Sequence, residues 1–137
     1  MLIKTHKTTD KKIEKPHFFI LSKGNNSGKP METPCPNCYA CISGSEEEKQ
    51  NLYWLFYGLW EGRYFQPFIT GSVIPFIRID DVKNVVELAL RKITEQPDKF
   101  KKNVSMVQLL NEKSIVIHEQ IKLIKYAKRA LMYEVLK

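Results

Sequence analysis

One segment limits the possible folds of this chain more than any other, a helix expected over residues 46–62. Its start is a capping box, Ser45-Glu46-Glu47-Glu48. The Ser45 hydroxyl can accept a hydrogen bond from the Glu48 amide, and the Glu48 carboxylate can accept one from the Ser45 amide. Apolar side chains then occur nearly all round the helix: Leu52, Tyr53, Trp54, Leu55, Phe56, Tyr57, Leu59 and Trp60. A helix with this pattern must be covered on most sides, so it is expected at the centre of the fold.

The segments around this helix predict a mixed α/β class. His17–Leu21 is a short apolar, β-prone strand between Pro16 and the turn-rich residues 22–30. Residues 68–79 are β-branched and aromatic but contain Gly71 and Pro75, which predicts one or two short strands around a bend. A helix over 82–94, capped by Asp80 or Asp81, follows. The expected architecture is a small sheet packed on the central aromatic helix, with a long C-terminal helix.

The C-terminal residues 103–137 form one long helical pattern with a heptad seam. Its positions alternate spacings of three and four: Val107, Leu110, Ser114, Ile117, Ile121, Ile124, Lys128, Leu131 and Val135. Two outcomes are open. The helix can form a homodimer through this seam, or Ile117, Ile121 and Ile124 can pack on the chain's own aromatic helix around Trp54 and Trp60. The expected organisation is a basic flexible arm or ragged edge strand over 1–15, an α/β domain over 16–102, and this helix.

Length and charge narrow the class of protein. A chain of 137 residues is expected to form one small soluble domain. It has no membrane-length apolar run and no signal-peptide core, so a cytoplasmic protein without a membrane partner is expected. The net charge is +7, with +5 in residues 1–30, −3 in 31–97 and +5 in 98–137. Basic ends are compatible with nucleic-acid binding, and equally with solvated surface lysines.

The turn after the first predicted strand is the best candidate for a contact surface. Gly24-Asn25-Asn26-Ser27-Gly28-Lys29 is one residue too short for a phosphate-binding P-loop, and Pro30 occupies the position of the metal-binding hydroxyl. A polar glycine-rich turn with Lys23 and Lys29 remains. Lysine can bind phosphate and asparagine can bind adenine edges, whereas the simpler interpretation is a plain turn.

No catalytic or cofactor site is expected. The three histidines are scattered, no nucleophile has a base and an orienting acid beside it in the pattern, and capping explains Asp80 and Asp81. Cys35, Cys38 and Cys41 form a Cys-x2-Cys-x2-Cys run, which is half of a zinc site at most because no histidine has the matching spacing. We expect reduced structural cysteines and no metal, with structural zinc or a redox or disulfide role as the alternatives.

Residues 51–85 resemble the closing half of the target recognition domains in type I restriction-modification specificity subunits. The resemblance rests on the aromatic helix, on Gly71-Ser-Val-Ile-Pro-Phe-Ile77, and on the helix start Asp81-Val-Lys-Asn84. It implies a domain that reads DNA sequence without catalytic residues, because methylation and cleavage belong to partner subunits. Together, residues 18–30, 34–38 and 71–79 also resemble a family of small proteins from Bacteroides-type mobile elements, which implies no function.

These observations predict a non-catalytic DNA-binding module similar to a target recognition domain. Its expected contact residues are Lys23, Asn25, Asn26, Lys29, Arg63 and Arg78. The alternative is a protein-interaction accessory or adaptor encoded by a mobile element, whose loops and C-terminal helix engage a protein partner.

Overall fold

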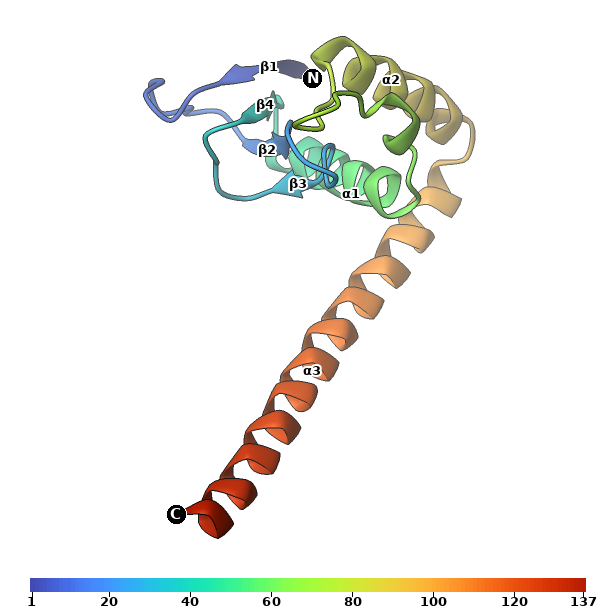
Figure 1. The fold of residues 1–137 in the computed structure, drawn as a ribbon. Helices are drawn as coiled ribbons and strands as arrows, with labels where there is room; N and C mark the ends of the chain where they lie inside the picture. The colour runs from blue at the N-terminus through green and yellow to red at the C-terminus, as the bar shows by residue number, and fades with distance from the viewer. The chain divides into compact units, whose positions relative to one another are not determined.

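The computed structural model describes every residue from Met1 to Lys137 and has a mixed α/β fold (Figure 1). The chain divides into two compact units, Met1–Pro97 and Asp98–Lys137. The first unit contains a four-stranded antiparallel sheet with the strand order β1-β4-β2-β3. Its strands are β1 (Leu2–His6), β2 (His17–Leu21), β3 (Pro30–Met31) and β4 (Cys38–Ile42).

The central strand β4 determines which side chains share a face of the sheet. It pairs with β1 along Leu2–His6 and with β2 along His17–Leu21, so that Phe18 lies opposite Cys41 and Phe19 opposite Ala40. Because side chains alternate along a strand, Phe18 and Cys41 point to one face and Phe19 and Ala40 to the other.

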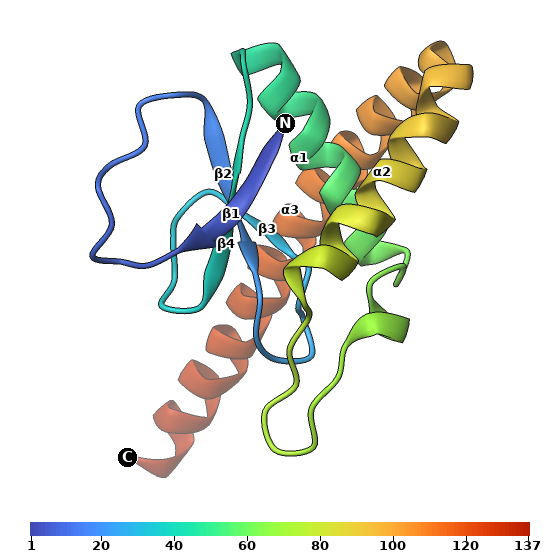
Figure 2. The same ribbon diagram turned by 90° about the horizontal axis from the view of Figure 1, so that it is seen from above.

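Two helices, α1 (Glu46–Glu61) and α2 (Ile79–Glu95), lie on the same side of the sheet (Figure 2). Phe18 is fully buried there, with its ring 5.5 Å from that of Tyr53 and 5.3 Å from that of Phe56. Val82 and Val86 of α2 are also fully buried. The aromatic helix therefore organises the main core, as its sequence predicts.

A smaller apolar cluster covers the second face of the sheet. Phe19, Cys38 and Ala40 are buried there, and loop residues pack against them, including Ile13 and Cys35. The expected arm over 1–15 is an edge strand followed by a loop: Ile3 of β1 is buried and anchors the strand.

The start of α1 confirms the predicted cap with one change of partner. The Glu48 amide donates to the Ser45 hydroxyl at 3.1 Å. The Glu48 carboxylate accepts from the Gly44 amide at 2.6 Å, rather than from the Ser45 amide. The hydrogen bond from Gly44 lowers the pKa of Glu48.

The strands predicted over 68–79 are wrong, and so is the predicted cap of the following helix. The segment consists of a 3-10 turn, η1 (Gln66–Phe68), and a turn in which Thr70 and Phe76 form an isolated bridge. Gly71 and Pro75, directly inside the Thr70–Phe76 bridge, prevent this pairing from extending into a ladder. Val73, in the turn between them, is 88% exposed. Helix α2 begins directly after Arg78, which places Asp80 and Asp81 in the first turn, where they complement the helix dipole.

The second unit is the helix α3 (Pro97–Leu136), 40 residues long, and none of its side chains is buried. It begins at Pro97, six residues before the expected Asn103, because proline suits a first helical turn that needs no amide donor. At a rise of about 1.5 Å per residue, the helix is about 60 Å long. No helix of the structure has the length and apolarity needed to cross a membrane.

Candidate nucleic-acid interface

The loop between β2 and β3 holds its backbone in one defined conformation. The Ser27 hydroxyl, fully buried, donates to the Gly24 carbonyl at 2.6 Å, and the Lys29 amide donates to the Asn26 carbonyl at 3.1 Å. The Gly28 amide donates back to the Leu21 carbonyl at 2.8 Å. The Gly24 amide donates outside the loop, to the Pro75 carbonyl at 2.7 Å. These hydrogen bonds hold the loop, while Asn25 and Asn26 remain exposed.

Gly28 fixes this loop to Phe65, in the segment that follows α1. Its φ is +96°, and a Cβ atom at this position would lie 2.3 Å from Cδ2 of Phe65. Phe65 is itself buried at 1% exposure and stacks on Phe56 with the ring centroids 6.0 Å apart. Only glycine allows the loop to approach this ring, so the loop rests directly on the core.

Arg63 occupies an unusual backbone position where α1 ends. The Tyr64 amide donates to the Leu59 carbonyl at 2.9 Å and the Arg63 amide to the Trp60 carbonyl at 3.0 Å, which is the hydrogen-bond pattern of a Schellman motif. The left-handed residue of such a motif is usually glycine. Here it is Arg63, at φ 61°, the only residue other than glycine with a positive φ. The helix end therefore carries a guanidinium where backbone geometry alone favours glycine.

These two segments enclose a shallow hollow of about 340 Å³. Its lining residues are Asn25, Asn26, Trp60, Glu61, Arg63 and Gln66. Across it, the Gln66 side-chain amide donates to the Asn25 carbonyl at 3.0 Å. The Lys29 ammonium lies over the Trp60 ring at 5.0 Å from its centroid, which is within cation–π range.

The other two predicted residues, Lys23 and Arg78, do not line this hollow. Lys23 pairs with Phe76 in an isolated bridge, and the Ile77 amide donates to the Ser22 carbonyl at 3.0 Å. This short pairing joins the loop to the segment before α2, where Arg78 is the residue that precedes the helix. The structure thus brings Asn25, Asn26 and Arg63 together with Lys29 at their edge.

We call Lys23–Lys29, residues 60–66 and Arg78 together the basic surface. Its net charge is positive and is not neutralised by ion pairs. Lys23, Lys29, Arg63 and Arg78 are exposed, and none of them forms a salt bridge. The one acid in the hollow, Glu61, accepts a hydrogen bond from the Tyr57 hydroxyl at 3.2 Å. Four cations that form no salt bridge, together with the exposed amides of Asn25 and Asn26, are suited to binding a polyanion.

The comparison with protein families matches residues 3–134, nearly the whole chain. The chain belongs to DUF6943, a family of unknown function. The DUF6943 region includes this basic surface and all but the last residues of α3. No curated protein and no solved structure matches the chain.

Three lining residues of the DUF6943 chain are not predicted from its sequence: Trp60, Glu61 and Gln66. Trp60 was assigned to the core with its aromatic neighbours, yet it is only partly buried and its ring faces Lys29. The residues Trp60-Glu61-Gly62-Arg63 contain a signal for a helix end, because a glycine beside a cation after an apolar run is typical of one. This signal places Trp60 in the last turn of the helix. Gln66 lies 41 residues from Asn25 and has no local signal.

The three cysteines do not assemble into the alternative zinc site. All are free thiols, and Cys38 and Cys41 lie three positions apart on β4, so their side chains leave opposite faces of the strand. No group of three metal-binding side chains converges anywhere in the structure. Burial raises the pKa of Cys41 to about 12 and also raises that of Cys38, which keeps both as unreactive thiols.

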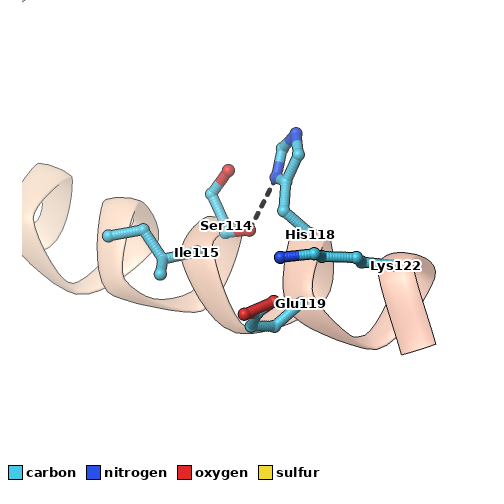
Figure 3. A pocket seen from close by; sticks show the side chains of 5 residues that line it. All are labelled: Ser114, Ile115, His118, Glu119 and Lys122. Atoms are coloured by element: carbon cyan, nitrogen blue, oxygen red, sulfur yellow. Dashed lines mark hydrogen bonds between the residues drawn. The ribbon is translucent and has the colours of Figure 1, made fainter.

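A second hollow lies on α3 alone and carries no built site (Figure 3). It is formed by Ser114, Ile115, His118, Glu119 and Lys122, which are neighbours along a single helix. Nδ1 of His118 is hydrogen-bonded to the Ser114 carbonyl at 2.8 Å, as the dashed line in Figure 3 shows. This furrow between exposed side chains holds nothing that would select a ligand.

Proposed function

We propose that the protein is a non-catalytic, cytoplasmic DNA-binding module whose contact surface is the basic surface described above. The observation that carries the proposal is the convergence of Asn25, Asn26 and Arg63 on one hollow, with Lys29 held over Trp60 at its edge. Residues distant in sequence thus present amides and unpaired cations on a single surface.

The side chains divide by chemistry into two roles. Lys23, Lys29 and Arg78 supply charge for phosphates, which gives affinity and orientation without sequence information. Asn25 and Asn26 can pair with adenine edges, and Arg63 can pair with guanine or phosphate. Because the loop backbone is already hydrogen-bonded and fixed on Phe65, binding would cost little ordering entropy.

The resemblance of residues 51–85 to target recognition domains supports the same proposal. Arg63 and Arg78 both lie within that segment, and both are exposed on the basic surface. In that family the DNA-reading domain leaves chemistry to partner subunits, which agrees with a site built of amides and cations rather than of an acid, a base and a nucleophile.

Binding of a labelled random-sequence duplex, followed by fluorescence anisotropy, tests the proposal. Four phosphate contacts would give a slope of about −3.6 in a plot of log affinity against log salt concentration. Affinity should then fall about 150-fold between about 50 mM and 200 mM KCl. A protein that does not bind at the lower salt concentration would refute the proposal.

A matched pair of double variants separates this surface from general charge. Lys23→Gln with Lys29→Gln should lower the magnitude of the slope by about 2, because two phosphate contacts are lost. Lys11→Gln with Lys12→Gln removes the same charge from exposed lysines of the loop after β1 and should leave the slope nearly unchanged. Equal losses in both double variants would show that the bound surface is not the one proposed.

A second candidate function, a protein-interaction accessory, is favoured by α3, whose large apolar side chains are exposed from Met106 to Leu136. Affinity purification in the presence of nuclease discriminates the two functions. A protein partner survives nuclease digestion, whereas a DNA-bridged one is lost.

A further inference from the structure

Large apolar side chains are exposed along helix α3 from Met106 to Leu136. Exposed residues of this kind are Met106, Leu109, Leu110, Ile115, Val116, Ile117, Ile121, Leu123, Ile124, Tyr126, Leu131, Met132, Tyr133, Val135 and Leu136. An exposed patch of this extent marks an interaction surface. Six of these residues lie in the heptad seam: Leu110, Ile117, Ile121, Ile124, Leu131 and Val135. The polar residues within the seam indicate what covers these six.

We propose that α3 pairs with α3 of a second copy of this chain in an antiparallel two-helix arrangement. In heptad terms, Ser114, Ile121 and Lys128 occupy a positions, and Ile117, Ile124 and Leu131 occupy d positions. The inference concerns assembly and does not depend on the proposed DNA binding.

A parallel pairing is disfavoured by the two polar a positions. In a parallel pair each a residue faces its own counterpart, so Lys128 would meet Lys128 and Ser114 would meet Ser114 inside the seam. The two Lys128 ammonium groups would repel each other in a partly desolvated environment. The parallel arrangement therefore places like charges together at one layer and two hydroxyls at another.

An antiparallel pairing removes both conflicts, because each a residue then faces a d residue of the other copy. With the symmetry centre between Ile121 and Ile124, these two residues face each other across the pair. In the same register, Lys128 faces Ile117 and Ser114 faces Leu131. Each polar residue is thus opposite an aliphatic one, and the Lys128 stem can lie along Ile117 while its ammonium reaches water.

The flanking charges agree with this register. Positions g of the two helices face each other in an antiparallel pair, and the register places Lys113 of one copy beside Glu134 of the other. Twofold symmetry repeats the pair at the other end. Both side chains are exposed on α3 and neither forms an ion pair within the chain. The g positions thus supply two complementary ion pairs per dimer.

The area available is sufficient for a stable pair. Six aliphatic seam residues per copy, Leu110, Ile117, Ile121, Ile124, Leu131 and Val135, are all exposed. At about 100 Å² for each side chain, a pair would bury about 1,200 Å² in total, which is within the range of specific interfaces. The seam from Leu110 to Val135 is about 38 Å long.

Carbodiimide cross-linking of the full chain, with mass spectrometry of the peptides, tests the orientation directly. Lys113 and Glu134 lie about 31 Å apart along one helix, too far for a zero-length cross-link within a chain. A Lys113–Glu134 cross-link in a dimer band is the expected result. A dimer whose cross-links omit this pair would overturn the antiparallel register, and a monomer at all concentrations would overturn the pairing itself.

Charge reversal gives a second and independent test by sedimentation equilibrium. Glu134→Lys should weaken the dimer about tenfold, because two attractive pairs become repulsive. Adding Lys113→Glu should restore the affinity to within about threefold. Both positions are solvent-exposed, so neither variant threatens folding. Failure of the double variant to recover would refute the Lys113–Glu134 contact.

Discussion

Replacing Arg63 by glycine should stabilise the protein and weaken its DNA binding in the same variant. Arg63 lies at φ 61°, where a side chain costs about 1 to 2 kcal/mol relative to the right-handed region. Glycine removes that cost but adds about 0.5 to 1 kcal/mol of backbone entropy to the unfolded chain. The net gain is about 0.7 kcal/mol, provided that the Schellman hydrogen bonds of Tyr64 and Arg63 are retained.

Differential scanning calorimetry measures the first half of this prediction. For a unit of 97 residues, a gain of this size raises the unfolding temperature by about 3 to 6 °C. Fluorescence anisotropy with the random duplex measures the second half. Loss of one guanidinium contact should weaken binding about three- to tenfold and reduce the magnitude of the salt slope by about 1.

Arg63→Ala is the matched control, because alanine removes the guanidinium and keeps a Cβ atom in the left-handed region. It should lose DNA affinity to the same extent as Arg63→Gly without gaining stability. If alanine stabilises the protein as much as glycine does, relief of backbone strain at this position is not the cause of the gain in stability. If neither variant changes DNA binding, Arg63 is not a contact residue.

Three further predictions concern the loop, the cysteines and the cap of α1. Gly28→Ala should destabilise the protein by about 3 kcal/mol in urea titrations, since its Cβ would lie 2.3 Å from the Phe65 ring. Gly24→Ala, also at positive φ but facing open space, should cost only about 1 to 2 kcal/mol. Equal costs for the two variants would contradict the packing argument. At about pH 8, a thiol reagent should label partly exposed Cys35 before Cys38 and Cys41, because burial raises the pKa values of these two thiols. Fast labelling of Cys41 in the native protein would be inconsistent with its pKa of about 12. Because the pKa of Glu48 is lowered in the folded state, its stabilising effect is present above its unfolded pKa and is lost as the pH falls through the folded value. The difference in unfolding free energy between wild type and Glu48→Gln should therefore shrink from about pH 6 to pH 3, and a constant difference over this range would contradict the argument.

The elements predicted correctly from sequence are those whose signals are local. The acidic start after Ser45 and the apolar run behind it locate α1, and the run between Pro16 and Ser22 locates β2 with its exact ends. Strand β4 is not predicted, because Pro34 and Pro36 favour a loop and the cysteine spacing of residues 35–41 favours a different interpretation. What makes it the central strand is pairing with two segments at least 17 residues earlier in the sequence.

The opposite failure occurred over residues 68–79, where local β propensity was strong and no strand formed. Val73 and Ile74 are strand-prone, but the turn that contains them leaves both exposed. In the candidate site, Asn25, Asn26 and Arg63 were predicted singly from their chemistry. Their convergence depends on Gly28 meeting Phe65, a tertiary contact that no local pattern encodes.

That contact between Gly28 and Phe65 also makes the loop a scaffold for altered recognition. The hydrogen bonds that shape the loop tip use the main chain and the side chains of Ser27 and Gln66. Asn25 and Asn26 contribute carbonyls rather than side chains to them. A library randomised at these two positions, with Gly24, Ser27 and Gly28 kept, should retain the fold while varying the surface offered to bases. The protein would then serve as a small framework from which binders of chosen specificity can be selected.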